Sequence, residues 1–135
     1  MMGRISLITR EGAFKRAERI RREYEAIYGI GFDLERAFVS LENLVPTQVE
    51  LSEGKLLLVL QEIKHGYDAP IIVIPHGGRY YIIDGHHRAF ALKKLGFDRV
   101  EAIILKPRSE FVPGIVKTAE KEGLKRLEDM KIVRD

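Results

Sequence analysis

Five consecutive residues, from Asp84 to Arg88, carry most of the chemistry that this sequence offers to a charged ligand. They read Asp-Gly-His-His-Arg and follow the apolar run Tyr80–Ile83. A strand that turns through a glycine into a helix exposes the first helical amides, which have no partner inside the helix. The helix dipole adds partial positive charge at the same place. The sequence therefore predicts an anion site at this turn, with phosphate as its usual occupant.

The side chains of the turn suit such a site in different ways. Gly85 has no Cβ, so an anion can approach the backbone closely. Arg88 can offer a bidentate contact to phosphate oxygens, and either ring of His86 and His87 can donate a hydrogen bond. Consecutive helical residues diverge by about 100°. We therefore expect only one of the two rings to face the ligand, and the sequence does not decide which.

Asp84 conflicts with a purely anionic ligand, because its carboxylate would lie beside another negative charge. Several roles would resolve the conflict. Asp84 can pair with Arg88 four residues later, or coordinate a Mg²⁺ ion that bridges to phosphate. It can accept a proton from a substrate hydroxyl, or cap the helix. The residues alone leave these roles open.

Hydrophobic spacing predicts the two longer helices that surround the turn. The first is expected over Glu11–Tyr28, with Thr9 as its cap and an apolar face made of Phe14, Ala17, Ile20, Tyr24 and Ile27. The second is expected to begin after the cap residue Ser52, to run to about Lys64 and to turn five residues inward: Leu56, Leu57, Val59, Leu60 and Ile63.

Shorter apolar runs and turn residues predict the remaining elements. Strands are expected over residues 37–44, 71–74, 80–83 and 99–105, and helices over 86–95 and 113–122, with a partly helical last segment. The pair Gly77 and Gly78 predicts a tight hairpin turn. Helices and strands mix without strict βαβ repetition, so the expected fold class is α+β, with a small mixed sheet and helices against it.

Composition limits the class of protein. The chain has 135 residues, no cysteine and a formal charge of +3, so one domain without disulfides or cysteine-based metal sites is expected. The apolar runs are far shorter than the ~20 residues of a membrane span, and Met1–Arg10 lacks the pattern of a signal peptide. These features predict a cytoplasmic protein, and the scarcity of Asn and Gln is typical of a thermophilic source.

A basic stretch precedes the predicted core. Six basic and three acidic residues lie between Arg10 and Glu23. This pattern is typical of a solvated helix face, and it also suits contact with a nucleic-acid backbone. The four histidines lack the spacing of a zinc site, so no zinc is expected.

The segment Ile82–Gly96, reading Ile-Ile-Asp-Gly-His-His-Arg-Ala-Phe-Ala-Leu-Lys-Lys-Leu-Gly, resembles the ParB/sulfiredoxin superfamily. Leu44–Gln48 is similar to the first box of ParB amino-terminal domains, and Pro70–Asp84 to the hairpin of the superfamily. The resemblance implies one ParB/sulfiredoxin-like domain over residues 1–135. Its core would span about 37–106, with helical extensions over 10–28 and 113–135.

The resemblance also implies a ligand, because the motif binds nucleotide phosphates in CTP-binding ParB proteins and in archaeal ADP-dependent free-serine kinases. The wording here is most similar to the kinases. By that likeness Gly85, His86, His87 and Arg88 bind the phosphates of ATP, ADP or CTP with Mg²⁺. Asp84 would lie near the transferred group, as a catalytic residue and metal ligand.

Two departures from the family patterns narrow the activity. Without cysteine, sulfiredoxin chemistry is excluded. The position of the kinases' general-base glutamate holds Gln48, and only Glu50, two residues later, offers a carboxylate nearby.

Three functions stay open. The first is a nucleotide-binding phosphotransferase or nucleotide hydrolase. The second is a DNA-binding module that acts in DNA partition, DNA cleavage or transcription. It is disfavoured because the stretch after the last predicted strand is too short for a helix-turn-helix domain. The third is a non-catalytic nucleotide-dependent regulatory partner. The candidate partners are a nucleotide, DNA and a second copy of this chain, but no membrane.

Overall fold

The computed structural model describes residues 6–135, so the first half of the segment examined for a signal peptide lies outside the described residues. The described chain contains four α-helices, two short 3₁₀ helices and seven strands, in the order α1 (Arg10–Tyr28), β1 (Phe32–Ser40), η1 (Leu41–Asn43), β2 (Leu44–Val45), β3 (Glu50–Ser52), α2 (Glu53–Lys64), β4 (Ile71–His76), β5 (Arg79–Asp84), α3 (His86–Lys94), β6 (Arg99–Pro107), α4 (Gly114–Lys121), η2 (Leu127–Asp129) and β7 (Lys131–Val133).

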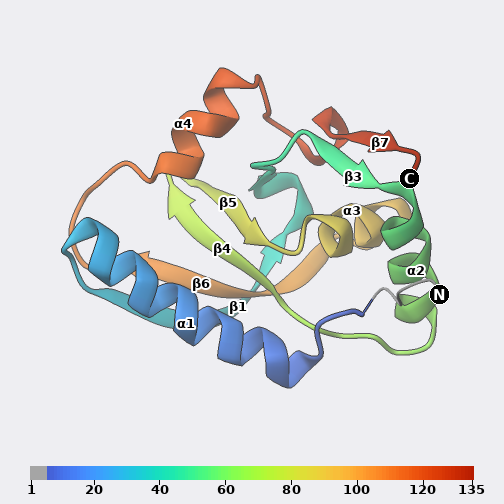
Figure 1. Ribbon diagram of the computed structural model, residues 1–135, viewed down its shortest axis with the longest axis horizontal. Coiled ribbons are helices and arrows are strands. Elements are labelled where there is room, and N and C mark those ends of the chain that lie inside the picture. Colours follow the sequence, from blue (N-terminus) through green and yellow to red (C-terminus); the bar gives the residue numbers. More distant parts are fainter. Residues whose placement is uncertain (1–5) are drawn as a thin grey trace.

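A five-stranded mixed sheet forms the centre of the fold, in the order β1-β6-β4-β5-β2 (Figure 1). The β1–β6 and β4–β5 pairs are antiparallel, whereas β4–β6 and β2–β5 are parallel. Strands β4 and β5 are joined through Gly77 and Gly78, both at positive φ, as the predicted hairpin turn requires. The α+β class predicted from the sequence is confirmed.

Helices cover both faces of the sheet, because alternate residues of a strand point to opposite sides. On one face, Ile71 and Val73 contact the buried side of α2 and α3. On the other, Ile72 and Ile74 contact Ala17 and other residues of α1. Strand β5 is therefore held between two apolar layers, which fixes the position of the turn at its end.

Both long helices begin where the sequence predicts, because their caps are made locally. The side chain of Thr9 accepts a hydrogen bond from the Gly12 amide, and that of Ser52 accepts one from the Lys55 amide. The predicted apolar faces are wrong at two residues, since Ile27 is 71% exposed and Leu57 is 60% exposed. Tyr24 and Tyr28 take the inward positions at the end of α1. Leu57 lies one helical step away from the buried Leu56.

The predictions for the first strand and for the last segment need correction. The strand expected over 37–44 begins earlier, at Phe32, because it pairs along its whole length with β6. It also breaks at Leu41, where a 3₁₀ turn intervenes. The last segment is only briefly helical and then forms β7, which pairs in parallel with β3. A two-stranded pair of three-residue strands leaves no periodic signal in the sequence, so neither strand was expected.

Within residues 6–135, no helix combines the length and the apolar character that crossing a membrane requires.

Candidate functional site

The chain leaves β5 at Asp84, turns at Gly85 and enters α3 at His86. Gly85 has a φ of 106°, a conformation that residues with a Cβ rarely adopt. A Cβ here would also lie 2.6 Å from Cγ2 of Ile71 and 2.8 Å from Nη2 of Arg88. Glycine is thus required by the backbone and by these two neighbours, a reason different from the close approach of an anion that the sequence suggested.

The first amides of α3 are free within the described chain. Gly85 provides no side-chain cap, and the first backbone hydrogen bond of the helix runs from the Ala89 amide to the Gly85 carbonyl. No described group accepts a hydrogen bond from the amides of His86, His87 and Arg88. These three donors are the ones that an anion at the helix start would use.

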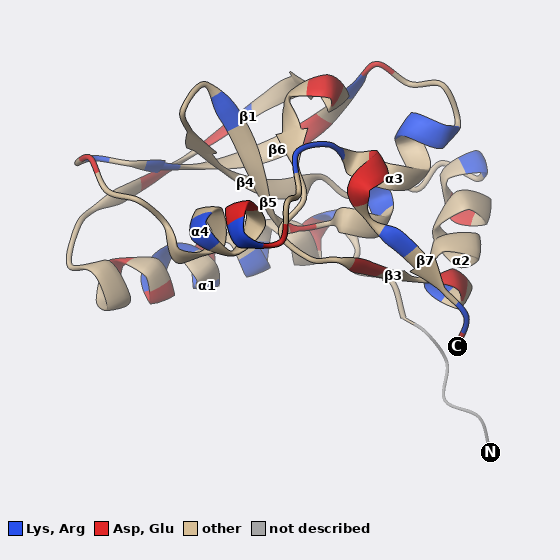
Figure 2. Cartoon of the chain, turned by 90° about the horizontal axis from the view of Figure 1, so that it is seen from above, with Lys and Arg blue, Asp and Glu red and all other residues tan. Residues whose placement is uncertain are grey.

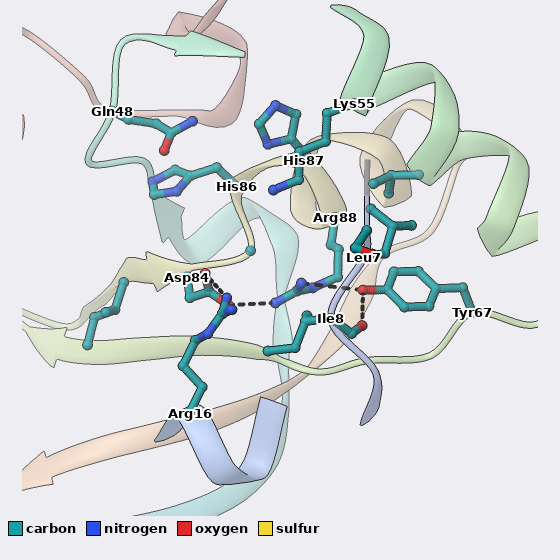
Figure 3. A pocket seen from close by; sticks show the side chains of 14 residues that line it. Leu7, Ile8, Arg16, Gln48, Lys55, Tyr67, Asp84, His86, His87 and Arg88 are labelled. Carbon is teal, nitrogen blue, oxygen red and sulfur yellow. Dashed lines mark hydrogen bonds and ion pairs between the residues drawn. The ribbon is translucent and has the colours of Figure 1, made fainter. Parts of the chain in front are cut away.

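A polar cavity of about 170 Å³ lies against this turn (Figure 3). The turn provides one wall, and the others come from the N-terminal segment Ser6–Ile8, α1, the loop after β2, and α2. The lining residues are Ser6, Leu7, Ile8, Arg16, Gln48, Lys55, Val59, Tyr67, Ile83, Asp84, Gly85, His86, His87 and Arg88. The fold therefore brings together all of the site residues expected from the sequence except one.

That exception is Glu50, which lies on β3 with an exposed side chain and does not line the cavity. Glu50 could replace the missing glutamate only if this loop were shifted, because alternation along β3 turns Leu51 inward and Glu50 outward. Gln48 does line the cavity, and its Nε2 donates to the Glu50 backbone carbonyl at 2.8 Å.

Both histidines border the cavity, so the expectation that only one would face it is wrong. The two rings point in different directions, and each binds a backbone amide of the segment between β2 and α2. Nε2 of His86 accepts a hydrogen bond from the Thr47 amide at 2.9 Å, and Nε2 of His87 accepts one from the Ser52 amide at 3.0 Å. Each ring, when neutral, therefore carries its proton on Nδ1. Nε2 of each ring is therefore occupied as an acceptor, and only the Nδ1–H group is left to donate a hydrogen bond.

Burial keeps both rings neutral. Removal from water lowers the pKa of His86 to about 3, and the nearby Asp84 charge opposes that shift. Burial together with the positive charge of Lys55 lowers the pKa of His87 to about 4. Near neutral pH these rings hold the loops at Thr47 and Ser52 in place and add no positive charge to the site.

Asp84 lies between two arginines (Figure 3). Its Oδ1 is 3.0 Å from Nη1 of Arg16, and its Oδ2 is 3.1 Å from Nη2 of Arg88. Of the roles left open by the sequence, the structure shows the ion pair with Arg88, and it adds Arg16 from a distant helix. Two guanidinium groups on one carboxylate repel a cation, so Asp84 does not fit the predicted role of a Mg²⁺ ligand in this arrangement. Residues 6–135 also lack any cluster of three or more side chains suited to a metal.

Arg88 is buried, with 7% of its surface exposed. Its Nη2 donates to Asp84 and to the Pro70 carbonyl, and its Nη1 lies 3.5 Å from the Tyr67 hydroxyl. Nε of Arg88 has no partner among the described atoms. The predicted bidentate contact to phosphate is wrong in this arrangement, because the guanidinium is already bound to protein groups.

Lys55 is a site residue that the sequence analysis missed. It is exposed in the first turn of α2, lines the cavity and has no ion-pair partner within residues 6–135. One signal could have found it: the Ser52 cap places Lys55 at the start of a helix, close to the chain segment that contains Gln48. Arg16 left no such signal, because only the fold brings α1 to β5.

Basic and acidic residues alternate along the chain (Figure 2), and most of the basic residues before Glu23 are paired with acids. Arg10 binds Glu101, Lys15 binds Glu11, Arg16 binds Asp84, and Arg21 binds Glu18 and Glu25. This pairing is typical of a solvated helix face, the first of the two interpretations of that stretch.

The comparison with family models settles the family. The model described as ParB N-terminal domain matches residues 38–120, more than half of the chain. The chain belongs to the ParB N-terminal domain family.

Curated relatives extend this result. The chain is 37% identical over 121 residues to an uncharacterized protein of Methanocaldococcus jannaschii, covering 88% of this chain and 45% of the relative. It is 37% identical over 76 residues to an ATP-dependent L-serine kinase of Staphylothermus marinus, covering 53% of this chain and 30% of the kinase. The chain thus spans less than half of the length of these relatives.

Among solved structures, protein Atu1540 from Agrobacterium tumefaciens matches with a TM-score of 0.59 and 19% identity, over 74% of this chain and 63% of that chain. At this identity the match shows a shared fold. The ParB-like fold implied by the sequence resemblance is confirmed, and the family is homologous to serine kinases.

Proposed function

We propose that this ParB-family chain binds the phosphates of a nucleotide at the start of α3. The observation that carries the proposal is the set of three unpartnered amides of His86, His87 and Arg88 beside a polar cavity. Amides at a helix start that bind no protein group are suited to anionic oxygens, because the helix dipole favours negative charge there.

The charges around the cavity support the same ligand. Asp84 would repel a phosphate, but Arg16 and Arg88 offset its charge through direct contacts. Lys55 then contributes a positive charge that no described carboxylate neutralises. A net positive cavity with free amide donors favours phosphate over a neutral ligand.

The size of the cavity indicates which part of a nucleotide it takes. Its volume of about 170 Å³ is small, since sites for whole small molecules usually measure about 300–1,000 Å³. The cavity therefore suits phosphate groups, with the base outside it. Among the predicted nucleotides ATP, ADP and CTP, homology to ATP-dependent L-serine kinases favours ATP.

A phosphotransferase is the second candidate, favoured by the same kinase relatives. Transfer to a hydroxyl needs a group that accepts its proton. Within the described cavity lining, Asp84 is bound to two arginines, the histidine Nε2 atoms accept backbone hydrogen bonds, and Gln48 carries an amide. These residues support binding without transfer to a hydroxyl, and a phosphotransferase would need a base from elsewhere.

Calorimetry with ATP, ADP, CTP and pyrophosphate, each with and without Mg²⁺, tests the binding proposal. Lys55→Ala should weaken pyrophosphate binding about three- to tenfold, the scale of one charge-assisted hydrogen bond at a partly exposed site. Lys64→Ala is the matched control, because Lys64 lies in the last turn of the same helix and does not line the cavity. Wild-type protein that binds none of the four compounds would refute the proposal.

A kinase assay separates the two candidates. Under the favoured proposal, wild-type chain incubated with ATP and L-serine forms no phosphoserine while calorimetry shows binding. Formation of phosphoserine by the wild-type chain would instead establish the phosphotransferase and overturn the proposal of binding without transfer.

A further inference from the structure

One wall of the cavity is a short segment without regular structure, Ser6–Thr9, which precedes α1. Ser6, Leu7 and Ile8 line the cavity, and Leu7 also contacts the apolar core beneath α2 and α3. Figure 3 shows this segment passing between the turn at Asp84 and Tyr67. Because it belongs to no helix or sheet, its position depends on a few individual contacts.

Tyr67 provides one of these contacts from a distant part of the chain. Its hydroxyl donates to the Ile8 carbonyl at 2.5 Å, joining the loop after α2 to a segment 59 residues earlier. The next anchor lies outside the cavity, where Arg10 binds Glu101 with two hydrogen bonds, of 2.5 and 2.8 Å, and donates to the Asp68 carbonyl at 3.2 Å. Within the described residues, Tyr67 is the side chain that hydrogen-bonds the backbone of this wall before α1 begins.

The same hydroxyl also faces the buried arginine of the site. It lies 3.5 Å from Nη1 of Arg88, whose Nε has no described partner. Without the hydroxyl, two of the three nitrogens of this buried guanidinium would lack a partner, which is costly in a region removed from water. Arg88 in turn offsets the charge of Asp84. One hydroxyl thus contacts both the wall of the cavity and the group that makes the cavity fit for an anion.

We propose that Tyr67 is a positioning residue of the phosphate site, acting through Ile8 and Arg88 without touching the ligand. This proposal rests on the phosphate-binding function proposed above. Loss of the hydroxyl loosens the wall and leaves Arg88 less firmly held against Asp84. Both changes weaken anion binding, because the wall and the compensating charge must be in place before the ligand arrives.

The variant Tyr67→Phe tests this role, since it removes the hydroxyl and keeps the ring. In the ligand-free protein, hydrogen exchange should accelerate about three- to tenfold at the amides of Gly12 and Ala13, which donate to the side chain and carbonyl of Thr9 next to the anchored Ile8, because the segment that holds their acceptors is released. Exchange at Ala17 and Ile20, in the buried middle of α1, should stay unchanged. Calorimetry should show pyrophosphate binding weakened by about the same three- to tenfold.

Tyr28→Phe is the matched control. The Tyr28 hydroxyl also hydrogen-bonds a distant backbone group, the Gly114 amide at 3.1 Å, and Tyr28 does not line the cavity. This variant should leave exchange at Gly12 and Ala13, and pyrophosphate affinity, as in the wild type. A merely structural role for Tyr67 would lower the melting temperature and leave affinity unchanged, and that result overturns the proposal.

Unchanged exchange at Gly12 and Ala13 in Tyr67→Phe also overturns it. These exchange measurements need no ligand, so they separate the two proposals. If the wild-type protein does not bind pyrophosphate, the phosphate function fails and with it the role of Tyr67 toward an anion. Faster exchange in Tyr67→Phe would then show only that the hydroxyl holds the segment.

Discussion

The helices α2 and α3 begin close together, and their first turns are completed in opposite ways. At α2 the Ser52 side chain accepts from the Lys55 amide, and the Asp135 carboxylate accepts from the Gly54 amide and from the Ser52 hydroxyl. At α3 the preceding residue is glycine, and the amides of His86 to Arg88 bind no described group. The protein satisfies its own donors at one helix start and leaves them free at the other.

This difference shows which helix start the protein completes by itself. A glycine in place of a side-chain cap costs a helix only a few tenths of a kcal/mol, so the free amides at α3 are only a small cost to stability. The sequence shows the same contrast, since a serine precedes α2 and a glycine precedes α3. His87 links the two starts, because its Nε2 accepts from the Ser52 amide.

The largest expected effect comes from changing the α3 start itself. Gly85→Ala should lower the free energy of unfolding by about 3 kcal/mol, because the added Cβ meets a strained φ and a close Ile71 methyl. Gly66→Ala separates the two causes, since Gly66 has a φ of 95° and open space around it. We expect about 1 kcal/mol there. Equal losses in urea unfolding of both variants would show that the contact with Ile71 does not matter.

The next effect is the acid sensitivity of the α3 start. The pKa of His86 is depressed to about 3 in the folded protein, against about 6.5 in an unfolded chain. The depressed pKa therefore stabilises the folded protein above about pH 6.5, and this stabilisation is lost progressively as the pH falls from 6.5 toward 3.

Urea unfolding from pH 7 to pH 4 measures this loss. Because the pKa of His87 is also depressed, to about 4, His86→Gln should remove about half of the decline and the double variant His86→Gln/His87→Gln most of it. His65→Gln, at an exposed position, should leave the decline as in the wild type. A wild-type slope that persists in His86→Gln would show that another group causes the acid sensitivity.

The smallest effect comes from the capped helix. Ser52→Ala should cost about 1 kcal/mol of stability, because the Lys55 amide loses its acceptor. Pyrophosphate affinity should change less than twofold, since the backbone amide that binds His87 remains. Thr9→Ala, which removes the equivalent cap of α1, gives the reference stability loss. A clear gain or loss of affinity in Ser52→Ala would show that the cap of α2 also takes part in anion binding.

The sequence predicted what depends on neighbouring residues. The caps at Thr9 and Ser52, the glycine hairpin, and the turn from β5 into α3 were all correct, because each is formed by side chains and φ angles within a few residues. The cluster of Gln48 with the Asp84–Arg88 turn was expected from the family resemblance, and both line one cavity. Their role in phosphate binding stays a prediction.

What the sequence could not predict depends on contacts between distant segments. The cavity is lined by three side chains from separate parts of the chain, Arg16, Lys55 and Tyr67. No pattern of neighbouring residues in the sequence predicts that they lie close together. The prediction that Arg88 binds phosphate with both nitrogens was wrong for the same reason. The motif predicts a free guanidinium, whereas in the fold this group binds Asp84 and the Pro70 carbonyl and lies next to the Tyr67 hydroxyl.

By itself, then, the order of residues determined an α+β chain with a glycine turn between a buried strand and a helix start. The tertiary structure alone decided which charges are already paired and which donors stay free. The physical reason is that ion pairing and burial depend on distances of a few ångströms between groups far apart along the chain.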